Sequence, residues 1–497
     1  MRRALLAAAA AGVAGACAIG PSYRRPDVGT PTAWRPASPT ADSLRPFYDS
    51  LRASRESIVS EPTISIDSVA NLDWFDLLQD AELRKLVETA LAQNRDVRVA
   101  LASIAEFRAQ YGATRGALFP RIDLNAEGGT QKTVFGSFGA SKFDVVRAAA
   151  DLQWEIDFWG RIRRATEAAR ADLLAREENQ RAVVLSLVSD VATAYLELRE
   201  LDVDLEISKR TLASNEETLR LARRRFEQGV ISELDVRQFE SEVANPAARV
   251  ADFERQIVQK ENQLSVLVGR NPGAIPRGRP LTEALAPVAI PAGLPASLLE
   301  RRPDVRQAEQ ELHAAMARIG VAKGALMPTL TLTGEYGTQS QDFSNLFQNS
   351  TEVYQLFGGI SFPLFTGGQV GKQVDAARAR AEQARYSYEQ TVLLALRDVN
   401  DALVGVRASR DVTAAQDRQT EALRAAYRLA DRRYQNGISN YLDVLDAQRS
   451  LFAAELSLAG AQRQQLAAAV QLYKALGGGW PGGVQADSTR GRRGGPP

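Results

Sequence analysis

The chain has 497 residues, and its 61 lysines and arginines nearly balance its 60 aspartates and glutamates. A chain with this balance lacks the basic excess that binds phosphate backbones, so we expect no nucleic acid among its partners. It contains a single cysteine, which excludes a disulfide bond within the chain.

The N-terminal residues predict a signal peptide over 1–16. Arg2 and Arg3 give a positive start, an apolar, alanine-rich run follows, and small residues precede Cys17. A cysteine at this place resembles a bacterial lipoprotein signal, in which the thiol is acylated and becomes the first residue. Since Ala18 rather than an aspartate follows, that resemblance implies the outer membrane. The alternative is an ordinary secretory signal in which Cys17 is incidental.

Two distant stretches of the chain are copies of each other. RRFEQGVISELDV at 224–236 and RRYQNGISNYLDV at 432–444 are offset by 208 residues. GALFPRIDL at 116–124 and GALMPTLTL at 324–332 share the same offset, and the register holds without a gap from Asp96 onward. A repeat of this length indicates a tandem duplication, so each copy is expected to fold into the same supersecondary unit.

The duplication and the composition divide the chain into six parts. Proline is dense between the two copies, which stops helices and is typical of a linker. The expected parts are a signal peptide (1–16), an extended N-terminal segment (17–70), the first copy (71–269), a proline-rich linker (270–297), the second copy (298–477) and a disordered C-terminal tail (478–497).

Each copy is expected to begin with a helix and to continue with two strands. Apolar spacing predicts a helix over 74–115, which Pro120 ends because proline lacks the backbone donor. The strands are expected at about 120–134 and 145–158 in the first copy, and at about 328–338 and 353–365 in the second.

The second strand of the first copy has two unlike faces. Leu152, Trp154, Ile156 and Phe158 alternate with Asp151, Gln153, Glu155 and Asp157. Both a soluble β-sandwich and a membrane β-barrel produce this alternation. Four strands per chain are too few to close a barrel, so a membrane barrel would require several copies of the chain.

Very long helices are expected after the strands. Apolar spacing predicts helices over about 160–228 and 370–436, far longer than the average of about 11–12 residues. Each is expected to turn back into a second helix, over about 232–268 and 440–476. Lengths like these are typical of coiled coils and helical barrels. Pro246 inside the first returning helix predicts a kink or a break in the backbone hydrogen-bond ladder.

The repeated stretches predict the turns of two helical hairpins. In each turn, a glycine suits the left-handed cap, a serine or asparagine suits the N-cap of the returning helix, and an aspartate follows three residues on. These residues are Gly229, Ser232 and Asp235 in the first copy, and Gly437, Asn440 and Asp443 in the second.

Beyond these patterns, the chain resembles the TolC-like outer-membrane factors, and among them the lipoprotein branch that serves RND-type drug-efflux systems. The resemblance covers essentially all of residues 17–480. It is carried by CAIGPSYRRP at 17–26, LDWFDLLQDAELRKLVETALAQNRDVR at 72–98, LPASLLERRPDVRQAE at 294–309, FPLFTGG at 362–368 and NYLDVLDAQRSLF at 440–452.

That resemblance implies a homotrimer of α+β membrane proteins, in which twelve strands, four from each chain, close one barrel in the outer membrane of a Gram-negative bacterium. The long helices would form an α-helical barrel that extends into the periplasm. The implied partners are a periplasmic adaptor protein, an inner-membrane RND-type pump and outer-membrane lipid. The implied function is the passive export of small molecules such as drugs, with no enzymatic chemistry and no cofactor.

Three residues at the second hairpin match the periplasmic gate of that family, in which an acidic ring forms the constriction. They are Tyr441, Asp443 and Asp446. For the two acids the alternative is a purely local role, because acidic side chains near a helix N-terminus stabilise it by roughly 0.3–1 kcal/mol.

Other polar residues suggest no chemistry of their own. We expect three acidic residues to face the lumen of the barrel, where contact with water is sufficient to explain their charge: Asp151, Glu155 and Asp157. His313 is the only histidine, and we expect a solvated or packed helix residue rather than a general base. The sequence contains no metal-ligand spacing, nucleophile elbow or phosphate-binding loop.

Two further functions stay open at this point. The same fold could serve type I protein secretion or metal-ion export, although the lipoprotein signal and the presence of only three methionines argue against them. A periplasmic coiled-coil scaffold without a pore is the second alternative. The alternation of acidic and aromatic residues over 151–158 argues against a scaffold.

Overall fold

A computed structural model describes residues 18–26, 28, 80–134, 140–281, 301–436 and 438–478. The expectations for the signal peptide, Cys17, most of the N-terminal segment, the linker beyond Leu281, Gly437 and the C-terminal tail fall outside these residues. The chain divides into two compact units. The first comprises Met1–Val28, Leu101–Asn179 and Arg306–Thr391, and the second comprises Gly29–Ala100, Gln180–Val305 and Val392–Pro497.

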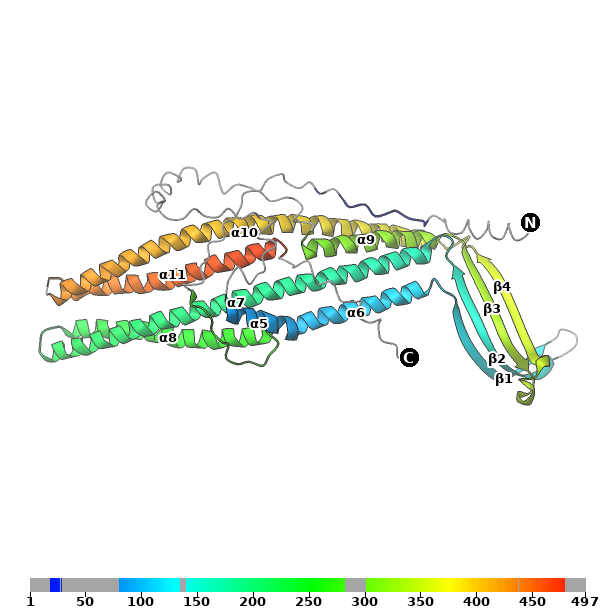
Figure 1. Ribbon diagram of the computed structural model, residues 1–497, viewed down its shortest axis with the longest axis horizontal. Coiled ribbons are helices and arrows are strands. Elements are labelled where there is room, and N and C mark those ends of the chain that lie inside the picture. The colour runs from blue at the N-terminus through cyan, green and yellow to red at the C-terminus, as the bar shows by residue number, and fades with distance from the viewer. Residues whose placement is uncertain are drawn as a thin grey trace, which may run out of the picture. The chain divides into compact units, whose positions relative to one another are not determined.

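The first unit contains a four-stranded antiparallel sheet (Figure 1). Its strands lie side by side in the order β1 (Arg121–Val134), β2 (Ala140–Ile156), β3 (Thr329–Ser340) and β4 (Glu352–Ser361). Two short 3-10 helices, η4 (Phe343–Asn345) and η5 (Asn349–Thr351), lie between β3 and β4 in the chain. Since β2 belongs to the first copy and β3 to the second, the two copies share one sheet.

The strand boundaries differ from the prediction at three ends. β2 begins at Ala140 rather than near 145, since its ladder with β1 continues to that residue. It ends at Ile156 because Asp157 caps the following helix. β4 ends at Ser361 rather than near 365, ahead of Pro363, which has no amide to donate to a ladder.

The helices of the two copies have the same lengths and lie 208 residues apart, as the duplication predicted. The longest are α7 (Arg161–Glu227) and α10 (Gln369–Gln435), with 67 residues each, followed by α8 (Glu233–Leu267) and α11 (Tyr441–Ala475), with 35 each. α6 (Arg95–Gly116) and α9 (Pro303–Gly324) have 22 residues each. Within the second unit, α7 and α8 form one helical hairpin and α10 and α11 form another (Figure 1).

The single helix predicted over 74–115 is wrong, because two helices meet there. α5 (Ala81–Gln93) and α6 are separated at Asn94. Oδ1 of Asn94 accepts hydrogen bonds from the amides of Asp96 (2.8 Å) and Val97 (3.1 Å), as the side chain of an N-cap residue does. The extended backbone of Asn94 (ψ 138°) therefore ends α5, and its side chain starts the next helix.

The same position fastens the end of the returning helix in both copies. Nδ2 of Asn94 donates to the carbonyl of Leu267, the last residue of α8 (2.9 Å). One repeat later Arg302 stands in this place, and its Nη1 donates to the carbonyl of Ala475, the last residue of α11 (2.9 Å). Different side chains thus satisfy the same orphan carbonyl at the two helix ends.

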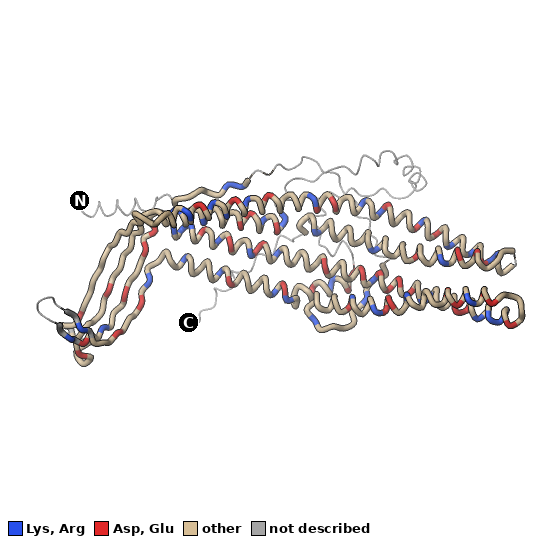
Figure 2. The backbone as a smooth tube through the Cα atoms, turned by 180° about the vertical axis from the view of Figure 1, so that it is seen from behind, with Lys and Arg blue, Asp and Glu red and all other residues tan. Residues whose placement is uncertain are grey.

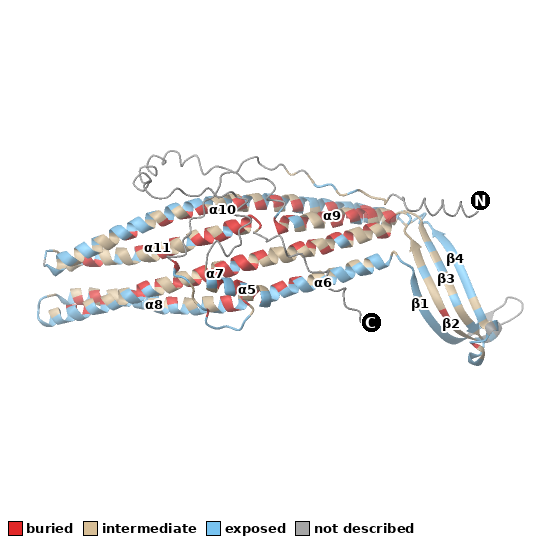
Figure 3. Cartoon of the chain, viewed as in Figure 1, coloured by how far each residue is buried: buried red, intermediate tan, exposed pale blue. Residues whose placement is uncertain are grey.

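The hydrophobic core of the second unit joins both copies. Figure 3 shows buried residues along α5, α7 and α11, whereas the hairpin ends are largely exposed. One continuous cluster includes Leu86 and Val87 of α5, Val191 and Leu198 of α7, Leu264 of α8, and Leu466 and Val470 of α11.

Pro246 lies within α8 without ending it. Proline has no amide hydrogen, so the carbonyl of Glu242 four residues earlier loses its helical partner. The side chain of Asn215 replaces that partner, since its Nδ2 donates to the Glu242 carbonyl (2.6 Å). The predicted break in the ladder is therefore confined to one bond, which α7 satisfies.

Candidate functional site

Backbone hydrogen bonds close the turn between α7 and α8. Gly229 has a φ of 70°, in the left-handed region that glycine adopts without strain. The amide of Val230 donates to the carbonyl of Arg225 and the amide of Gly229 to that of Phe226, both at 2.8 Å, as in a Schellman motif. One repeat later the amide of Ile438 donates across the second turn in the same way (2.9 Å).

Both returning helices start at a side-chain cap. Ser232 and Asp235 form a capping box at the start of α8, in which each side chain binds the backbone of the other residue. At the start of α11, Oδ1 of Asn440 accepts a hydrogen bond from the amide of Asp443 (3.3 Å). The two hairpin ends are therefore built alike, and their exposed side chains distinguish them.

An aromatic cluster joins the two hairpin ends. The ring of Tyr441 lies 4.1 Å from that of Phe239 in the first copy and 5.2 Å from that of Tyr434, measured between centroids. Burial raises the pKa of the Tyr441 hydroxyl well above its usual range. Nη1 of Arg225 donates to the hydroxyl of Tyr434 (2.5 Å), and its guanidinium lies 5.4 Å from the centre of that ring. Tyr441 thus packs between the copies instead of projecting from the end.

Asp443 and Asp446 lie on the first turns of α11, three residues apart, and both are exposed. Among the described residues, no ion pair within 4.0 Å involves either carboxylate, although Asp446 lies near enough to Arg449 to contribute to the raised pKa of that guanidinium. Figure 2 shows that residues of both charges are otherwise interspersed along the helices. Two exposed carboxylates are therefore present at this hairpin end.

Polar contacts continue along the line where α11 meets the first copy. We call the four pairs the within-chain locks, because each joins α7 or α8 to α11. They are Asn215 with Gln448 (2.6 Å), Glu242 with Arg449 (2.8 Å), Arg210 with Glu455 (2.5 Å) and Glu200 with Arg463 (2.9 Å).

One face of the sheet is charged. Arg147 of β2 forms ion pairs with Glu127 of β1 (3.1 Å), with Asp151 (3.1 Å) and with Glu335 of β3 (2.7 Å). The register places Asp151 between Asp123 and Glu335 on the same face. One guanidinium therefore joins three strands, and acidic groups outnumber it. Asp151 lies on this polar face, where the sequence pattern placed it.

The other two predicted lumen acids have local partners. Glu155 accepts two hydrogen bonds from the guanidinium of Arg161 (3.1 and 2.6 Å). Asp157 lies beyond the end of β2, and its largely buried carboxylate accepts hydrogen bonds from the amides of Ile162 (3.0 Å) and Arg163 (2.8 Å). Asp157 therefore caps the first turn of α7, and whether it also faces a lumen stays a prediction.

The opposite face of the sheet is apolar and exposed in the single chain. Exposed apolar surface of this extent marks a region that lipid or another chain covers. The exposed large side chains on this face are Ile122, Leu124, Tyr336, Tyr354, Leu356 and Ile360.

The single histidine packs against the N-terminal segment. The ring of His313 on α9 stacks on that of Tyr23 (4.8 Å between centroids), and its Nε2 is 3.0 Å from Oε1 of Glu167. The Tyr23 hydroxyl donates to Glu309 (2.9 Å), which Arg25 also binds (2.6 Å). Sequence periodicity did not reveal these contacts, because it carries no signal for pairs that lie 146 to 290 residues apart in the chain.

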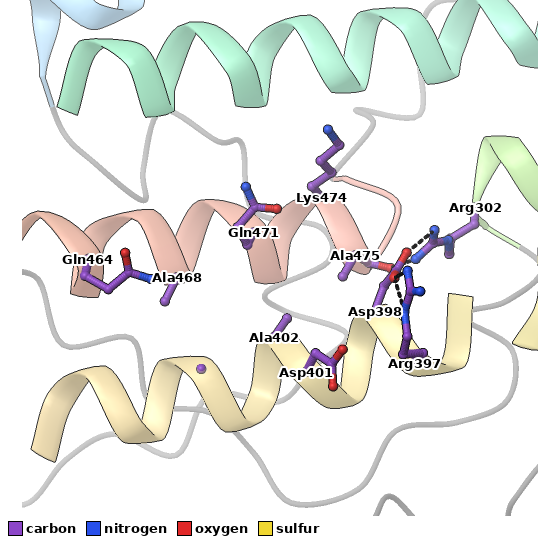
Figure 4. A pocket seen from close by; sticks show the side chains of 11 residues that line it. Arg302, Arg397, Asp398, Asp401, Ala402, Gln464, Ala468, Gln471, Lys474 and Ala475 are labelled. Atoms are coloured by element: carbon purple, nitrogen blue, oxygen red, sulfur yellow. Dashed lines mark hydrogen bonds and ion pairs between the residues drawn. The ribbon is translucent and has the colours of Figure 1, made fainter. Parts of the chain in front are cut away.

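A pocket of about 570 Å³ opens beside Arg302 in the second unit (Figure 4). Asp398 and Lys474 help to line it, and Nη2 of Arg302 contacts Asp398 (3.2 Å). In the first copy, α5 packs against the equivalent parts of α7 and α8. The residues that correspond to α5 in the second copy are 289–301, and all but the last lie outside the described ones. We assign no ligand to this pocket.

Two features are absent from the described part of the chain. No group of three or more His, Cys, Asp or Glu side chains there is placed to hold a metal ion. No helix among them is both long and apolar enough to cross a membrane.

Comparison with known proteins identifies the family. Residues 86–270 and 294–478 both match the family described as Outer membrane efflux protein, and the two matches are one repeat apart. The toluene efflux pump outer membrane protein TtgF of Pseudomonas putida is 34% identical over 469 residues, which cover 93% of this chain and 94% of the relative. The antibiotic efflux pump outer membrane protein ArpC of the same species is 33% identical over 489 residues, covering 97% and 96%.

Solved structures agree with this assignment. The outer-membrane channel OprN has a TM-score of 0.80 at 30% identity, covering 93% of this chain and all of its own. The open state of the MtrE outer membrane channel of Neisseria gonorrhoeae has a TM-score of 0.80 at 31% identity, covering 93% of this chain and 98% of its own. The chain therefore belongs to the outer membrane efflux protein family. It is an outer-membrane efflux channel and not an enzyme.

Proposed function

We propose that the chain works as a homotrimer, forming the outer-membrane duct of a tripartite efflux system that exports drugs and organic solvents. Relatives that match nearly its whole length are named for toluene and antibiotic efflux. A duct of this kind selects its cargo weakly, so the pump that loads it sets the range of compounds. Protein secretion and metal-ion export by the same fold are the alternative cargoes.

The two-faced sheet is the observation that carries the proposal. Its four strands leave β1 and β4 as open edges, and an exposed edge invites pairing with another chain. Three chains would supply twelve strands and close a barrel without edges. The face around Arg147 and Asp151 would then line a water-filled lumen, and the exposed apolar face would contact lipid.

The hairpin ends would form the gate on the periplasmic side. Three chains would bring six carboxylates together, from Asp443 and Asp446 of each chain. A ring of this charge favours cations and resists close approach of its own members. The aromatic cluster around Tyr441 would hold each second hairpin against the first, so opening the gate requires this cluster to separate or to move as a whole.

The hairpin ends also offer a surface for the periplasmic adaptor protein. Val230 and Leu234 are exposed at the first end, and Ile438 and Leu442 are exposed at the equivalent positions of the second. In a trimer these aliphatic pairs would form a ring of six similar patches, which suits an adaptor that meets the duct end to end. An inner-membrane RND-type pump would complete the assembly, and acylation of Cys17 would anchor the chain to the outer membrane.

The proposal is tested by expressing the gene in a strain that lacks its own outer-membrane duct. Wild-type protein should restore tolerance to toluene and to antibiotics, and it should run as a trimer after cross-linking. A Cys17→Ser variant should change in membrane fractionation and retain the trimer. Export of a secreted protein or of a metal ion without restored drug and solvent tolerance would instead favour the alternative cargoes.

A further inference from the structure

Asp204 of α7 is a buried carboxyl group within the second unit. The residue is only 8% exposed, and its Oδ1 has no hydrogen-bond partner among the described residues. One helical turn further on, the buried hydroxyl of Ser208 also lacks a partner there. Aspartate is rarely buried to this degree unless it is paired. The fold therefore leaves two neighbouring polar groups unsatisfied at this place.

Asp204 lies on the face of α7 that packs against the second hairpin. Leu196, Glu200 and Asp204 follow one another at successive turns, so their side chains lie along one face of the helix. Leu196 shares a core cluster with Leu466 of α11, and Glu200 binds Arg463 of α11 (2.9 Å). The carboxyl group is therefore buried in the contact between the two hairpins of one chain.

The charged groups around Asp204 already have partners of their own, in ion pairs that join this part of α7 to α8 or to α11. The pairs are Glu197 with Lys260 (2.6 Å), Glu200 with Arg463 (2.9 Å), Lys209 with Glu254 (2.8 Å) and Arg210 with Glu455 (2.5 Å). None of the ion pairs in the described part of the chain includes Asp204 itself. Burial, together with the smaller effect of the negative charge on Glu200, raises the pKa of this carboxyl group to about 7.

The second copy shows that the repeated unit does not need a carboxyl group at this position. One repeat later, Val412 occupies the equivalent position of α10, where it is 51% exposed. The buried position thus has the acidic residue and the exposed position has the apolar one, which is the reverse of what burial favours. Packing alone does not account for Asp204.

We propose that Asp204 is a proton-binding site that controls how tightly the two hairpins of one chain hold together. The protonated carboxyl group is neutral, so α7 packs on α11 without a buried charge, and its O–H supplies a donor for the hydroxyl of Ser208. The ionised group is an unpaired charge in a buried contact, which costs free energy until water reaches it. Ionisation therefore loosens the contact between the hairpins. The consequence for the duct rests on the proposed function and goes beyond it by naming pH as a regulatory input.

The contact should loosen as the pH rises from acid to neutral. Once water reaches the carboxyl group, its pKa returns to the ordinary value of about 3.9, whereas in the closed contact it is about 7. The closed contact therefore has its full stability below about pH 4, loses stability as the pH rises toward 7, and changes little above that value. These two values predict that the ratio of open to closed contact rises by at most about 50-fold between pH 5 and pH 7.

Hydrogen exchange of the full-length, detergent-solubilised protein tests the proton site. Peptides that cover residues 198–210 and 455–465 are followed from pH 5 to pH 8, and each rate is divided by the intrinsic exchange rate at that pH. In the wild type the corrected rate should rise roughly tenfold or more between pH 5 and pH 7 and then level off. Asp204→Asn, which keeps the size of the side chain, and Asp204→Val, which copies the second repeat, should show no rise. Glu206→Gln removes an exposed acid from the same helix and should keep the rise of the wild type. An Asp204→Asn variant with the pH dependence of the wild type would overturn the proposal.

A neighbouring substitution shows whether the titrating group is Asp204. Glu200→Gln removes the nearby negative charge and releases Arg463, so the midpoint of the rise in exchange should move to lower pH. A general weakening of the contact would raise exchange at every pH without moving this midpoint. An unmoved midpoint, or one that moves to higher pH, would contradict the assignment to Asp204.

Single-channel recording then tests the consequence for the duct. Wild-type trimers should open roughly tenfold more often at pH 7 than at pH 5, whereas Asp204→Asn trimers should open at both pH values as rarely as the wild type does at pH 5. Both proteins retain Asp443 and Asp446, so the difference between them isolates Asp204. The same pH dependence in both would overturn control of opening by this residue. Wild-type trimers that never conduct would instead overturn the proposed duct, and the exchange experiment would still decide whether Asp204 binds a proton.

Discussion

Replacing Asn215 with leucine should destabilise α8, and replacing Pro246 with alanine should remove most of that effect. The Asn215 side chain is buried and donates to the carbonyl of Glu242, which the proline leaves without a helical partner. An alanine at 246 would supply the missing amide. The second copy already carries this combination, with Leu423 and Ala454 at the equivalent positions.

The hydrogen bonds of Asn215 give the size of the effect. An unpaired buried carbonyl costs about 1–3 kcal/mol, and loss of the contact with Gln448 adds about 1 kcal/mol. Asn215→Leu should therefore cost about 2–4 kcal/mol in the wild-type background and about 1 kcal/mol in the Pro246→Ala background. The coupling energy between the two sites is then about 1–3 kcal/mol, or roughly a 5- to 150-fold change in local opening.

Hydrogen exchange of the detergent-solubilised trimer measures this opening directly. Peptides that cover residues 240–250 should exchange faster in Asn215→Leu and near the wild-type rate in the double variant. The second copy provides a reciprocal control. There, Ala454→Pro should increase the hydrogen-exchange rate of α11, and adding Leu423→Asn should reverse part of that increase. Equal effects of Asn215→Leu in both backgrounds would refute the assigned role of the Glu242 carbonyl.

Three more substitutions test separate contacts. Arg302→Ala removes the donor to the carbonyl of Ala475 and one partner of Asp398, which Arg397 also binds. Exchange at the end of α11 should rise as expected for a loss of about 1–3 kcal/mol, and Arg302→Asn should lose less because the first copy uses asparagine there. Tyr434→Phe keeps the ring and removes the hydroxyl to which Arg225 donates, at a cost of about 1.5–3 kcal/mol. Because this contact joins the two hairpin ends, openings in single-channel records should become more frequent. Unchanged records would contradict a role of the contact in keeping the gate closed. Burial, reinforced by a neighbouring carboxylate, raises the pKa of Asp204 to about 7. The wild type should therefore lose stability relative to Asp204→Asn as the pH rises from about 4 to about 7, by at most about 4 kcal/mol, and a thermal unfolding difference that is flat with pH would contradict this burial.

The repeat and the architecture that follows from it could be predicted from the sequence. Periodicity predicted the four long helices to within a few residues, because an uninterrupted apolar stripe leaves no alternative to a helix. The alternation around Asp151 and Leu152 predicted a strand with two unlike faces. The turn residues Gly229 and Ser232 have the backbone positions that their chemistry favours. These predictions rest on local sequence patterns, and the second copy shows the same patterns independently.

Tertiary contacts account for what the sequence did not predict. The side chain of Asn94, at the break between α5 and α6, binds the end of α8. The apolar periodicity of this segment gives no information about that contact. Asp157 continues the alternation of β2 in sequence but caps α7 in space. Pro246 is tolerated because Asn215, 31 residues earlier, satisfies one carbonyl. In each case a polar side chain satisfies a backbone group on another element, and only the fold brings the two together.

The most direct test of a gated duct is the current through single trimers in a planar lipid bilayer. Wild-type protein should conduct ions, with a preference for cations that the acidic ring imposes. A variant with Asp443→Asn and Asp446→Asn keeps the size of both side chains, and it should conduct more current with a weaker preference for cations. Wild-type trimers that never conduct would contradict the duct, and a variant with the conductance and cation preference of the wild type would contradict the gate.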